Sequence, residues 1–414
     1  DWLLEPAGDN VDVIDMYAKS YDASKITICT IHWPQPEAYD PAEEFSPTYP
    51  AATLTFIPDQ GNILALSYQR CLDQGVDFHF ATWAKQLIRP DNTGRVQGVI
   101  GRDIDGNYIK FLARKGVIMA AGDYGSNEAM VKHFCGGRTY STMFTSRDAN
   151  GATTNIGEGQ CMGVWIGAKL EDGPHAPMTH TLGGSLGVDP YLLLNAEGRR
   201  FCNEDVAGQQ LSSQLYRQKN EFGWSIFDDN YPDQVELMGC SHGSVNHILP
   251  AEDVPNLSGA VMTIGRSAIT SRSAVERSST MADTIEELAA KLYKDEAAQQ
   301  NMIAAVERYN ELARKGQDDD FHKSAKRLFP IEKAPFYASK ISAGSMLVCL
   351  GGLSVDPDTL QVVDEDMNPI DGLYAAGNNM GGRILQDYPV TIAGASHGTC
   401  LTFGYLVGRK AAEG

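Results

Sequence analysis

The sequence predicts an α/β fold, and two apolar strands followed by glycine carry that prediction. Residues 116–122 ("GVIMAAG") have few polar side chains, which is typical of a strand buried on both faces of a parallel sheet. The glycine-rich segment 372–398 contains another apolar strand that ends at Gly377, and a terminal helix begins just after Gly394. Since α/β folds bind ligands at the carboxyl ends of their strands, we expect a binding site at Gly377.

A meander of three strands is expected between residues 76 and 112. Apolar and polar residues alternate there, and turn residues separate the runs at 92–94 and 105–107. Residues 1–70 instead mix helix-like pieces with a proline-rich segment at 33–50.

Helices are expected where apolar residues recur with helical period or where end signals occur. Residues 157–170 predict one helix. The residues that share one face of it are Cys161, Val164, Trp165 and Ala168. A capping box with Asp283 at the N-cap opens another helical stretch. A helical pattern over 304–313 ends at Gly316, which is a C-cap signal.

Size and charge bound the class of protein. The chain has 414 residues, of which 43% are hydrophobic, so we expect two or three folded domains. The net charge of -19 disfavours nucleic acid and anionic membranes as partners. No apolar run reaches transmembrane length, and the first residue is not an initiator methionine, so the compartment stays open between cytoplasmic and exported.

The eight cysteines are scattered along the chain. None forms a CxxC pair, and no cysteine–histidine spacing matches a zinc site. We therefore expect buried free thiols and no metal.

Five segments of the chain occur in an order that points to one family. They are "GVIMAAGDYGSN", "GEGQCMGVWIGAKL", "LLLNAEGRRFCNED", "DTIEELAAKL" with "VERYN", and "GLYAAGN…YP…GASHGTCLTFGYLVGRKAA". In this order they resemble the flavoproteins of the fumarate reductase, succinate dehydrogenase and 3-ketosteroid dehydrogenase superfamily. The resemblance covers most of the chain.

The resemblance implies a Rossmann-like FAD-binding domain with an inserted α+β cap. The FAD-binding domain would be discontinuous, over 1–170 and 345–414, and the cap would occupy 171–344. The family's opening GxGxxG turn has no counterpart, since the glycines at 157, 159 and 163 have a different spacing. We therefore expect the FAD-binding domain to be incomplete at its N-terminus, which puts tight FAD binding by this chain alone in question.

The cofactor implied by the resemblance is non-covalent FAD. The residues implied to line it are Ala84, Ala120, Ala121, Gly122, Glu158, Gly377, Asn378, Ala395, Ser396 and His397. Backbone N–H groups at the start of the last helix would stabilise negative charge on the flavin. For Glu158 the alternative is a simple charge at a helix N-terminus, and for Ala84 an ordinary strand residue. For Gly394 and Gly398 the alternative is tight helix packing.

The reaction implied by the resemblance is hydride exchange with flavin N5 at a carbon–carbon bond next to a carbonyl. Tyr388 and Gly394 match the family's ketone-polarising pair, with two extra residues between them, and Tyr388 would donate the proton. Arg383 would steer a substrate or an electron donor. The alternatives are a half-buried core tyrosine at 388 and a surface or ion-paired arginine at 383. His180 lies near a catalytic histidine of some members, but a structural role is the alternative.

The substrate expected from these residues is a small molecule with an activated C=C bond, such as a steroid-like or other apolar enone. The family's carboxylate-binding arginine would fall on Tyr388 or Thr391, so a dicarboxylate is disfavoured. Two alternatives stay open: a fumarate-type carboxylate reductase, and a non-catalytic remnant that binds a ligand or partner without flavin. The sequence does not identify the electron donor.

Overall fold

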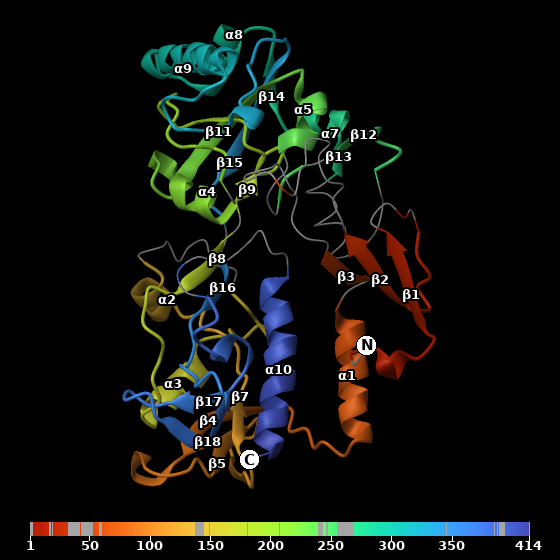
Figure 1. Cartoon of the computed structure of the whole chain (residues 1–414), viewed down its shortest axis with the longest axis vertical. Coiled ribbons are helices and arrows are strands. Elements are labelled where there is room, and N and C mark those ends of the chain that lie inside the picture. Colours follow the sequence, from red (N-terminus) through yellow and green to blue (C-terminus); the bar gives the residue numbers. More distant parts are fainter. Residues whose placement is uncertain are drawn as a thin grey trace. The chain divides into compact units, whose positions relative to one another are not determined.

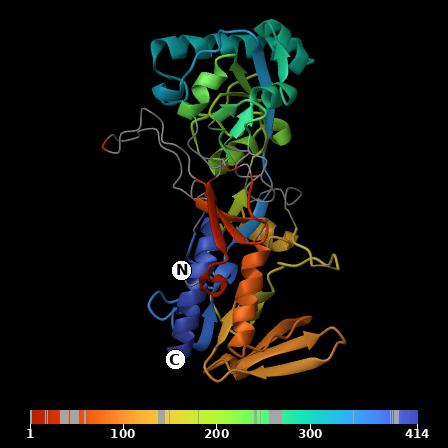
Figure 2. The same cartoon turned by 90° about the vertical axis from the view of Figure 1, so that its right-hand side faces the viewer.

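The computed structural model shows a mixed α/β protein (Figures 1 and 2). The residues that it describes are 3–15, 18, 20–31, 42, 53–57, 60–136, 145–148, 150–179, 181–206, 208–238, 243–245, 247–254, 269–344, 346–384, 386, 388 and 394–413. The chain divides into two compact units, and each of them is made from segments far apart in the sequence. The first unit comprises 1–77, 181–343 and 390–393, and the second comprises 78–180, 344–389 and 394–414.

The second unit is built around two parallel strands. Its elements are β4 (Thr82–Ile88), β5 (Gly98–Asp103), β6 (Tyr108–Leu112), β7 (Val117–Met119), α2 (Glu128–Phe134), α3 (Glu158–Trp165), β8 (Ala176–Thr179), β16 (Met346–Leu350), β17 (Gln361–Val363), β18 (Pro369–Ala375), η6 (Gly377–Asn379) and α10 (Ala395–Glu413). β7 pairs with β18 in parallel, and β18 pairs with β17 in antiparallel orientation. Both predicted apolar strands are therefore confirmed, and the structure shows that they are neighbours. The expected burial of the first strand on both faces is wrong, because Ile118 is exposed.

The predicted meander is also confirmed. β4, β5 and β6 form an antiparallel sheet of their own, which Figure 2 shows as three adjacent strands. Its register shifts between Ala84 and Gln86, where β4 carries an irregularity.

The helix predicted over 157–170 is shorter than expected. α3 ends at Trp165 because Gly167 takes a left-handed conformation with φ of +90°. The predicted apolar face of α3 does not pack against the core, because Val164 and Trp165 are exposed. Its buried residues are Gly159, Gln160, Met162 and Gly163.

The N-terminal part of the first unit contains strands that the sequence analysis did not anticipate. β1 (Val11–Asp15) pairs in parallel with β2 (Ile26–Ile31), which pairs in antiparallel orientation with β3 (Thr53–Ile57). α1 (Gly61–Asp73) follows. Most of the proline-rich segment at 33–50 lies outside the described residues.

The remainder of the first unit is an antiparallel sheet covered by helices. Its elements are β9 (Leu182–Gly183), β10 (Leu192–Leu194), α4 (Gly208–Leu215), β11 (Phe222–Asp228), α5 (Tyr231–Met238), β12 (His247–Leu249), β13 (Ile269–Ser271), α7 (Arg272–Arg277), β14 (Thr280–Ala282), α8 (Ile285–Leu292), α9 (Glu296–Lys315) and β15 (Phe336–Ser342). The strand order of the antiparallel sheet is β10–β11–β15–β14, with β9 also on β15, and β12 and β13 form a separate parallel pair. α8 and α9 lie side by side (Figure 1), and their apolar residues share one core with the sheet.

The predicted helix ends are confirmed in part. The N-cap of α8 is Thr284, whose side chain accepts a hydrogen bond from the Glu287 amide at 3.1 Å, so the assignment of Asp283 is wrong by one residue. Glu287 stands three residues after Thr284, so the capping-box pattern is satisfied one position later than expected. The predicted C-cap is confirmed, since Gly316 has φ of +73° after the last residue of α9.

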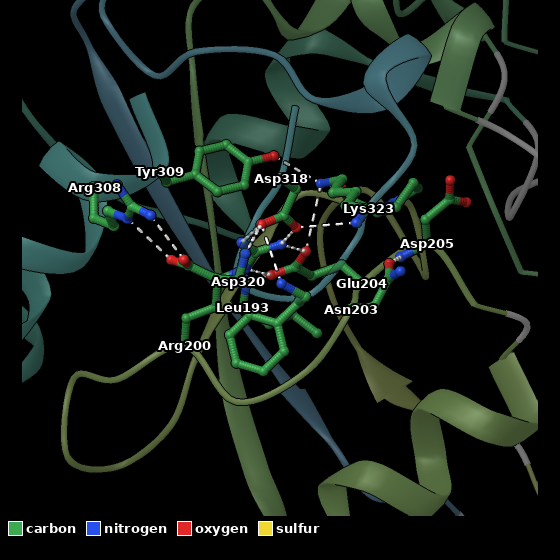
Figure 3. A network of polar contacts seen from close by, with 12 residues as sticks. Leu193, Arg200, Asn203, Glu204, Asp205, Arg308, Tyr309, Asp318, Asp320 and Lys323 are labelled. Atoms are coloured by element: carbon green, nitrogen blue, oxygen red, sulfur yellow. Dashed lines mark hydrogen bonds and ion pairs between the residues drawn. The ribbon is translucent and has the colours of Figure 1, made fainter. Parts of the chain in front are cut away.

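A network of buried charges links the loop after β10 to the segment after α9 (Figure 3). Arg200 makes paired hydrogen bonds to Glu204, both at 2.8 Å, and to Asp318, at 3.0 and 2.7 Å. Lys323 is fully buried, and its ammonium donates to the Tyr309 hydroxyl at 2.7 Å. Burial opposes ionisation of Asp318, but the contacts with Arg200 and the amides of Lys323 and Phe321 outweigh it and lower the pKa to about 2. This carboxylate therefore stays ionised at neutral pH.

No helix among the described residues is both long and apolar enough to cross a membrane.

Replacing Arg200 should destabilise the first unit. Arg200→Met leaves the carboxylates of Glu204 and Asp318 buried with less compensating charge, which costs about 3–5 kcal/mol in comparable cases. Arg308→Met is the matched control, because Arg308 pairs with Asp320 and Glu311 at a half-exposed site. Urea denaturation should show a large loss for Arg200→Met and little change for Arg308→Met; equal effects would contradict the prediction.

Candidate functional site

The carboxyl ends of β7 and β18 lie side by side and form the centre of the candidate site. Ala375 pairs with Met119, and the Ala376 amide donates to the Met119 carbonyl at 2.9 Å. The ladder therefore brings residues 120–122, which follow β7, next to 377–379, which follow β18. Ala120 and Ala121 are exposed, so their backbone is accessible at this edge. The structure thus brings together two of the segments that the sequence assigned to a ligand.

Asn379 fastens the two strand ends together. Its side-chain amide accepts a hydrogen bond from the Ala121 amide at 2.5 Å and donates to the Gly122 carbonyl at 2.9 Å. Asn379 is fully buried. Its side chain therefore continues the hydrogen bonding between β7 and β18 beyond the last paired strand residues. Because the Ala121 N–H already donates to Asn379, a ligand at this edge would form hydrogen bonds with neighbouring backbone groups. The sequence analysis assigned no role to Asn379.

Gln160 ties the start of α3 to the same edge. Its side-chain nitrogen lies within hydrogen-bond distance of three carbonyls, those of Gly122 at 3.2 Å, Gly351 at 3.4 Å and Asn378 at 3.3 Å. Its side-chain oxygen is buried and has no hydrogen-bond partner among the described residues. Gln160 follows the "GEG" turn, but the sequence analysis did not single it out.

The start of α3 needs glycine because it packs closely against Asn379. A Cβ at Gly159 would lie 2.4 Å from the Asn379 side-chain oxygen, which is far inside contact distance. Gly157 precedes the helix with φ of +86°, and its amide donates to the Asp123 carbonyl at 3.2 Å. Glu158 is half-buried in the first turn of α3, where its charge suits the helix N-terminus.

The start of α10 forms the second part of the site. The helix begins at Ala395, directly after Gly394, which has φ of +73°. The Ser396 amide donates to the Tyr388 hydroxyl at 2.9 Å, so the phenol caps this helix end. Tyr388 is buried, and burial raises its pKa, while the Ser396 amide and the charge of Arg383 oppose the rise. Tyr388 therefore stays protonated at neutral pH, with its oxygen oriented by the helix.

Arg383 and Asn378 connect the β18 end to α10. The guanidinium of Arg383 donates to the Asn378 side-chain oxygen at 3.1 Å, to the Thr399 hydroxyl at 2.5 Å and to the Met380 carbonyl at 3.1 Å. The Ser396 hydroxyl also donates to the Asn378 oxygen, at 3.4 Å. Burial lowers the pKa of Arg383, while the nearby Glu171 carboxylate opposes this shift.

One half-buried and one buried carboxylate hold the loops around the site. Glu171 accepts hydrogen bonds from the amides of Gly352 and Gly382, and burial raises its pKa while these two bonds oppose the shift. Asp123 accepts the Cys349 amide at 2.8 Å, and burial raises its pKa to about 6. Both side chains bond backbone amides, which makes them braces of the surrounding loops.

The remaining predicted residues are less closely connected. Ala84 lies exposed in β4, and no contact joins it to the strand ends within the described part of the chain. His397 is exposed in the first turn of α10. His180 lies outside the described residues.

The residues present at this site fit FAD. Two parallel strand ends expose backbone at residues 120–122, and the start of α10 offers the polar end of a 19-residue helix. The side-chain nitrogen of Gln160 holds the carbonyls of Gly122 and Asn378 in place at this edge.

Comparison with known proteins identifies relatives of this chain. The model of the FAD binding domain family matches residues 44–385, which confirms the predicted resemblance and FAD as the cofactor. The chain is 27% identical to a vinyl phenol reductase of Lactiplantibacillus plantarum, over 82% of this chain and 68% of that protein. It is 28% identical to a 3-oxosteroid 1-dehydrogenase of Mycolicibacterium smegmatis, over 76% of this chain and 55% of that protein.

A solved structure shows the same fold. The open conformation of a flavocytochrome c3 fumarate reductase matches with a TM-score of 0.54 and 23% identity, over 87% of this chain and 57% of that chain. Together these matches show that the chain spans between about half and two thirds of the length of these relatives.

Adding a methyl group at Gly159 should disturb the site. Gly159→Ala forces the Asn379 side chain out of its contact, and such overpacking costs about 1–3 kcal/mol. Gly404→Ala is the control, because nothing lies within 4 Å of a Cβ there and alanine favours the helix by up to about 1 kcal/mol. Thermal unfolding should show a lower Tm for the first variant and an equal or higher Tm for the second; a Gly159→Ala protein as stable as the wild type would rule out the close contact.

Proposed function

This chain belongs to the FAD binding domain family, and from that premise we propose that it is an FAD-dependent oxidoreductase acting on a C=C bond next to a carbonyl. The names of its relatives support a reaction at a C=C bond, since they include a vinyl phenol reductase and a 3-oxosteroid 1-dehydrogenase, and the second of these names also supplies a carbonyl. FAD, when bound, supplies hydride exchange with one carbon of that bond. The observation that carries the proposal is the Tyr388 hydroxyl held at the start of α10.

Tyr388 acts as the proton donor in this proposal. Its oxygen accepts the Ser396 amide, and no described residue is recorded as accepting its own hydroxyl hydrogen. An amide that donates to a phenol oxygen stabilises the phenolate, so the hydroxyl hydrogen becomes a better donor. A substrate carbonyl oxygen that becomes negative during reduction would take this hydrogen bond, and the proton would follow.

Gly394 and Arg383 assist at the same place. The Gly394 backbone stands directly before α10, where an N–H group and the helix dipole both favour negative charge. Arg383 adds its positive charge to that end and lowers the cost of charge on the substrate oxygen. These roles require a neutral substrate that becomes anionic in the transition state, such as an apolar or steroid-like enone.

A carboxylate substrate is the second candidate, and the contacts of Arg383 disfavour it. Three N–H groups of its guanidinium are already engaged by Asn378, Thr399 and Met380. A carboxylate clamp needs a free pair of parallel N–H donors. The match to the flavocytochrome fumarate reductase therefore supports the fold and does not indicate the substrate.

The second unit is proposed as the core of a Rossmann-like FAD-binding domain. β7 pairs with β18 on one side, and no described strand pairs with its other side. Ile118 on this strand and Leu401 on α10 are exposed apolar residues. A further parallel strand would cover them and complete the sheet. The predicted α+β cap over 171–344 would serve as the substrate domain. A protein that cannot hold FAD would instead support the ligand-binding remnant.

Tyr388→Phe should slow substrate reduction while leaving FAD bound. Loss of a positioned proton donor lowers turnover by about 10²–10⁴-fold. Tyr108→Phe, on the exposed meander, is the control. Both holoenzymes should show the same flavin content by visible absorbance. Burial raises the pKa of Tyr388, so the protonated phenol persists as the pH rises. Deprotonation of Tyr388 should therefore not reduce turnover at any pH below about 10. Unchanged turnover in Tyr388→Phe would remove it from the mechanism.

The substrate class can be tested by anaerobic titration of the reduced holoenzyme. We expect reoxidation by enones and no reoxidation by fumarate, because three of the five N–H donors of Arg383 are already engaged. Flavin absorbance near its visible maximum reports the redox state directly. Reoxidation by fumarate alone would overturn the substrate proposal, and a full-length protein that holds no FAD would support the remnant instead.

A further inference from the structure

A cavity of about 590 Å³ lies between β4 and the end of α3. Its lining includes three apolar residues, Ile88, Ile100 and Trp165, and the last of these is 62% exposed. The volume falls within the range of about 300–1,000 Å³ that is typical of small-molecule sites. None of the lining residues belongs to the candidate FAD site, so the proposed function leaves this cavity without a role.

Three side-chain hydrogen bonds hold the walls of the cavity together. Arg89 donates from Nε to the Gly94 carbonyl and from Nη1 to the Ile166 carbonyl, both at 2.8 Å. Asn92 donates to the Trp165 carbonyl at 3.1 Å. The turn after β4 is therefore tied to the last carbonyls of α3, so the cavity is formed before a ligand arrives.

Two opposite charges line this cavity without pairing with each other. Arg89 forms no ion pair with a described carboxylate, and its second terminal nitrogen is bonded to no described residue. Asp91 is exposed, and within the described part of the chain its carboxylate has no bonding partner. Asp91 and Asn92 both have φ of +53°, a left-handed conformation that residues with side chains seldom adopt and that recurs at binding sites.

This lining suits a ligand that carries both charges. A carboxylate matches the open N–H groups of the Arg89 guanidinium. An ammonium group matches the Asp91 carboxylate, and an apolar side chain matches Trp165 and the two isoleucines. A ligand with negative charge alone would be repelled by Asp91, and one with positive charge alone would be repelled by Arg89. An α-amino acid carries the three matching groups on one carbon atom.

We propose that this cavity binds a zwitterionic ligand with an apolar side chain, either a free amino acid or a dipeptide. Arg89 binds its carboxylate, Asp91 binds its ammonium group, and Trp165 packs against its side chain. This site also accounts for the exposure of Trp165, which the apolar pattern of α3 had assigned to the core. The inference is independent of the proposed reaction, because no residue is shared between the two sites.

The test is calorimetric titration of the full-length protein with ligands that differ by one group. L-Phenylalanine carries both charges, 3-phenylpropanoate lacks the ammonium group, and 2-phenylethylamine lacks the carboxylate. L-Leucine and the dipeptide leucyl-phenylalanine are titrated alongside. The variants are Asp91→Asn and Trp165→Ala. Their matched controls are Asp105→Asn and Trp83→Ala, at exposed positions that do not line the cavity. The Tm of each variant is measured as well.

In the wild type, phenylalanine should bind at least about 10-fold more tightly than either single-charge analogue, the size of one charge-assisted hydrogen bond. Asp91→Asn should lose the preference over 3-phenylpropanoate and keep the preference over 2-phenylethylamine. Trp165→Ala should weaken the binding of all three ligands, and both controls should bind like the wild type. Tighter binding of the dipeptide than of either amino acid identifies peptides as the ligand, and the reverse order identifies free amino acids.

Two results would overturn the proposal. One is a wild-type protein that binds phenylalanine, leucine and the dipeptide no more tightly than the single-charge analogues, and this measurement needs no variant. The other is an Asp91→Asn protein that keeps the wild-type preference for phenylalanine over 3-phenylpropanoate, which would place the binding elsewhere on the chain. A protein that passes both tests but reduces no enone would refute the proposed reaction and leave this inference standing.

Discussion

The parallel pairing of β7 with β18 is the constraint on which the site depends. These strands are separated by about 250 residues in the sequence, yet Leu373, Tyr374 and Ala375 pair in register with Val117, Ile118 and Met119. Their carboxyl ends therefore emerge at one edge, and the loops that follow meet there. Without this pairing, residues 120–122 and 377–379 would not share a site.

Side-chain amides extend that pairing beyond the strands. Asn379 bonds the backbone of Ala121 and Gly122 in place of a further strand residue, and Gln160 adds the start of α3 to the same edge. The close approach allowed by Gly159 makes this arrangement possible. The polar contacts are enclosed, so each is stronger than it would be in water, and each unpartnered group is correspondingly costly. The site is therefore rigid where backbone must approach a cofactor.

The start of α10 adds the electrostatic half of the site. The helix end, the Tyr388 hydroxyl and the guanidinium of Arg383 gather around Asn378 and Ser396. All three favour negative charge at one place, which suits an oxygen or a ring edge that becomes anionic during a reaction. The contacts that orient Arg383 also use its N–H donors. Arg383 therefore contributes positive charge, while fewer of its donors are left to bind a carboxylate.

The sequence by itself determined the family, the two apolar strands, the meander and the start of the last helix, because hydrophobic period and glycine position are local signals. It did not predict β1–β3, and it placed the apolar face of α3 wrongly, since tertiary packing overrode the period there. Only the tertiary structure revealed Asn379 and Gln160 as braces. Gln160 lies 218 residues from Asn378, and no local pattern encodes a hydrogen bond across that separation. Such contacts are decided by where the folded strands end, which is a property of the whole sheet.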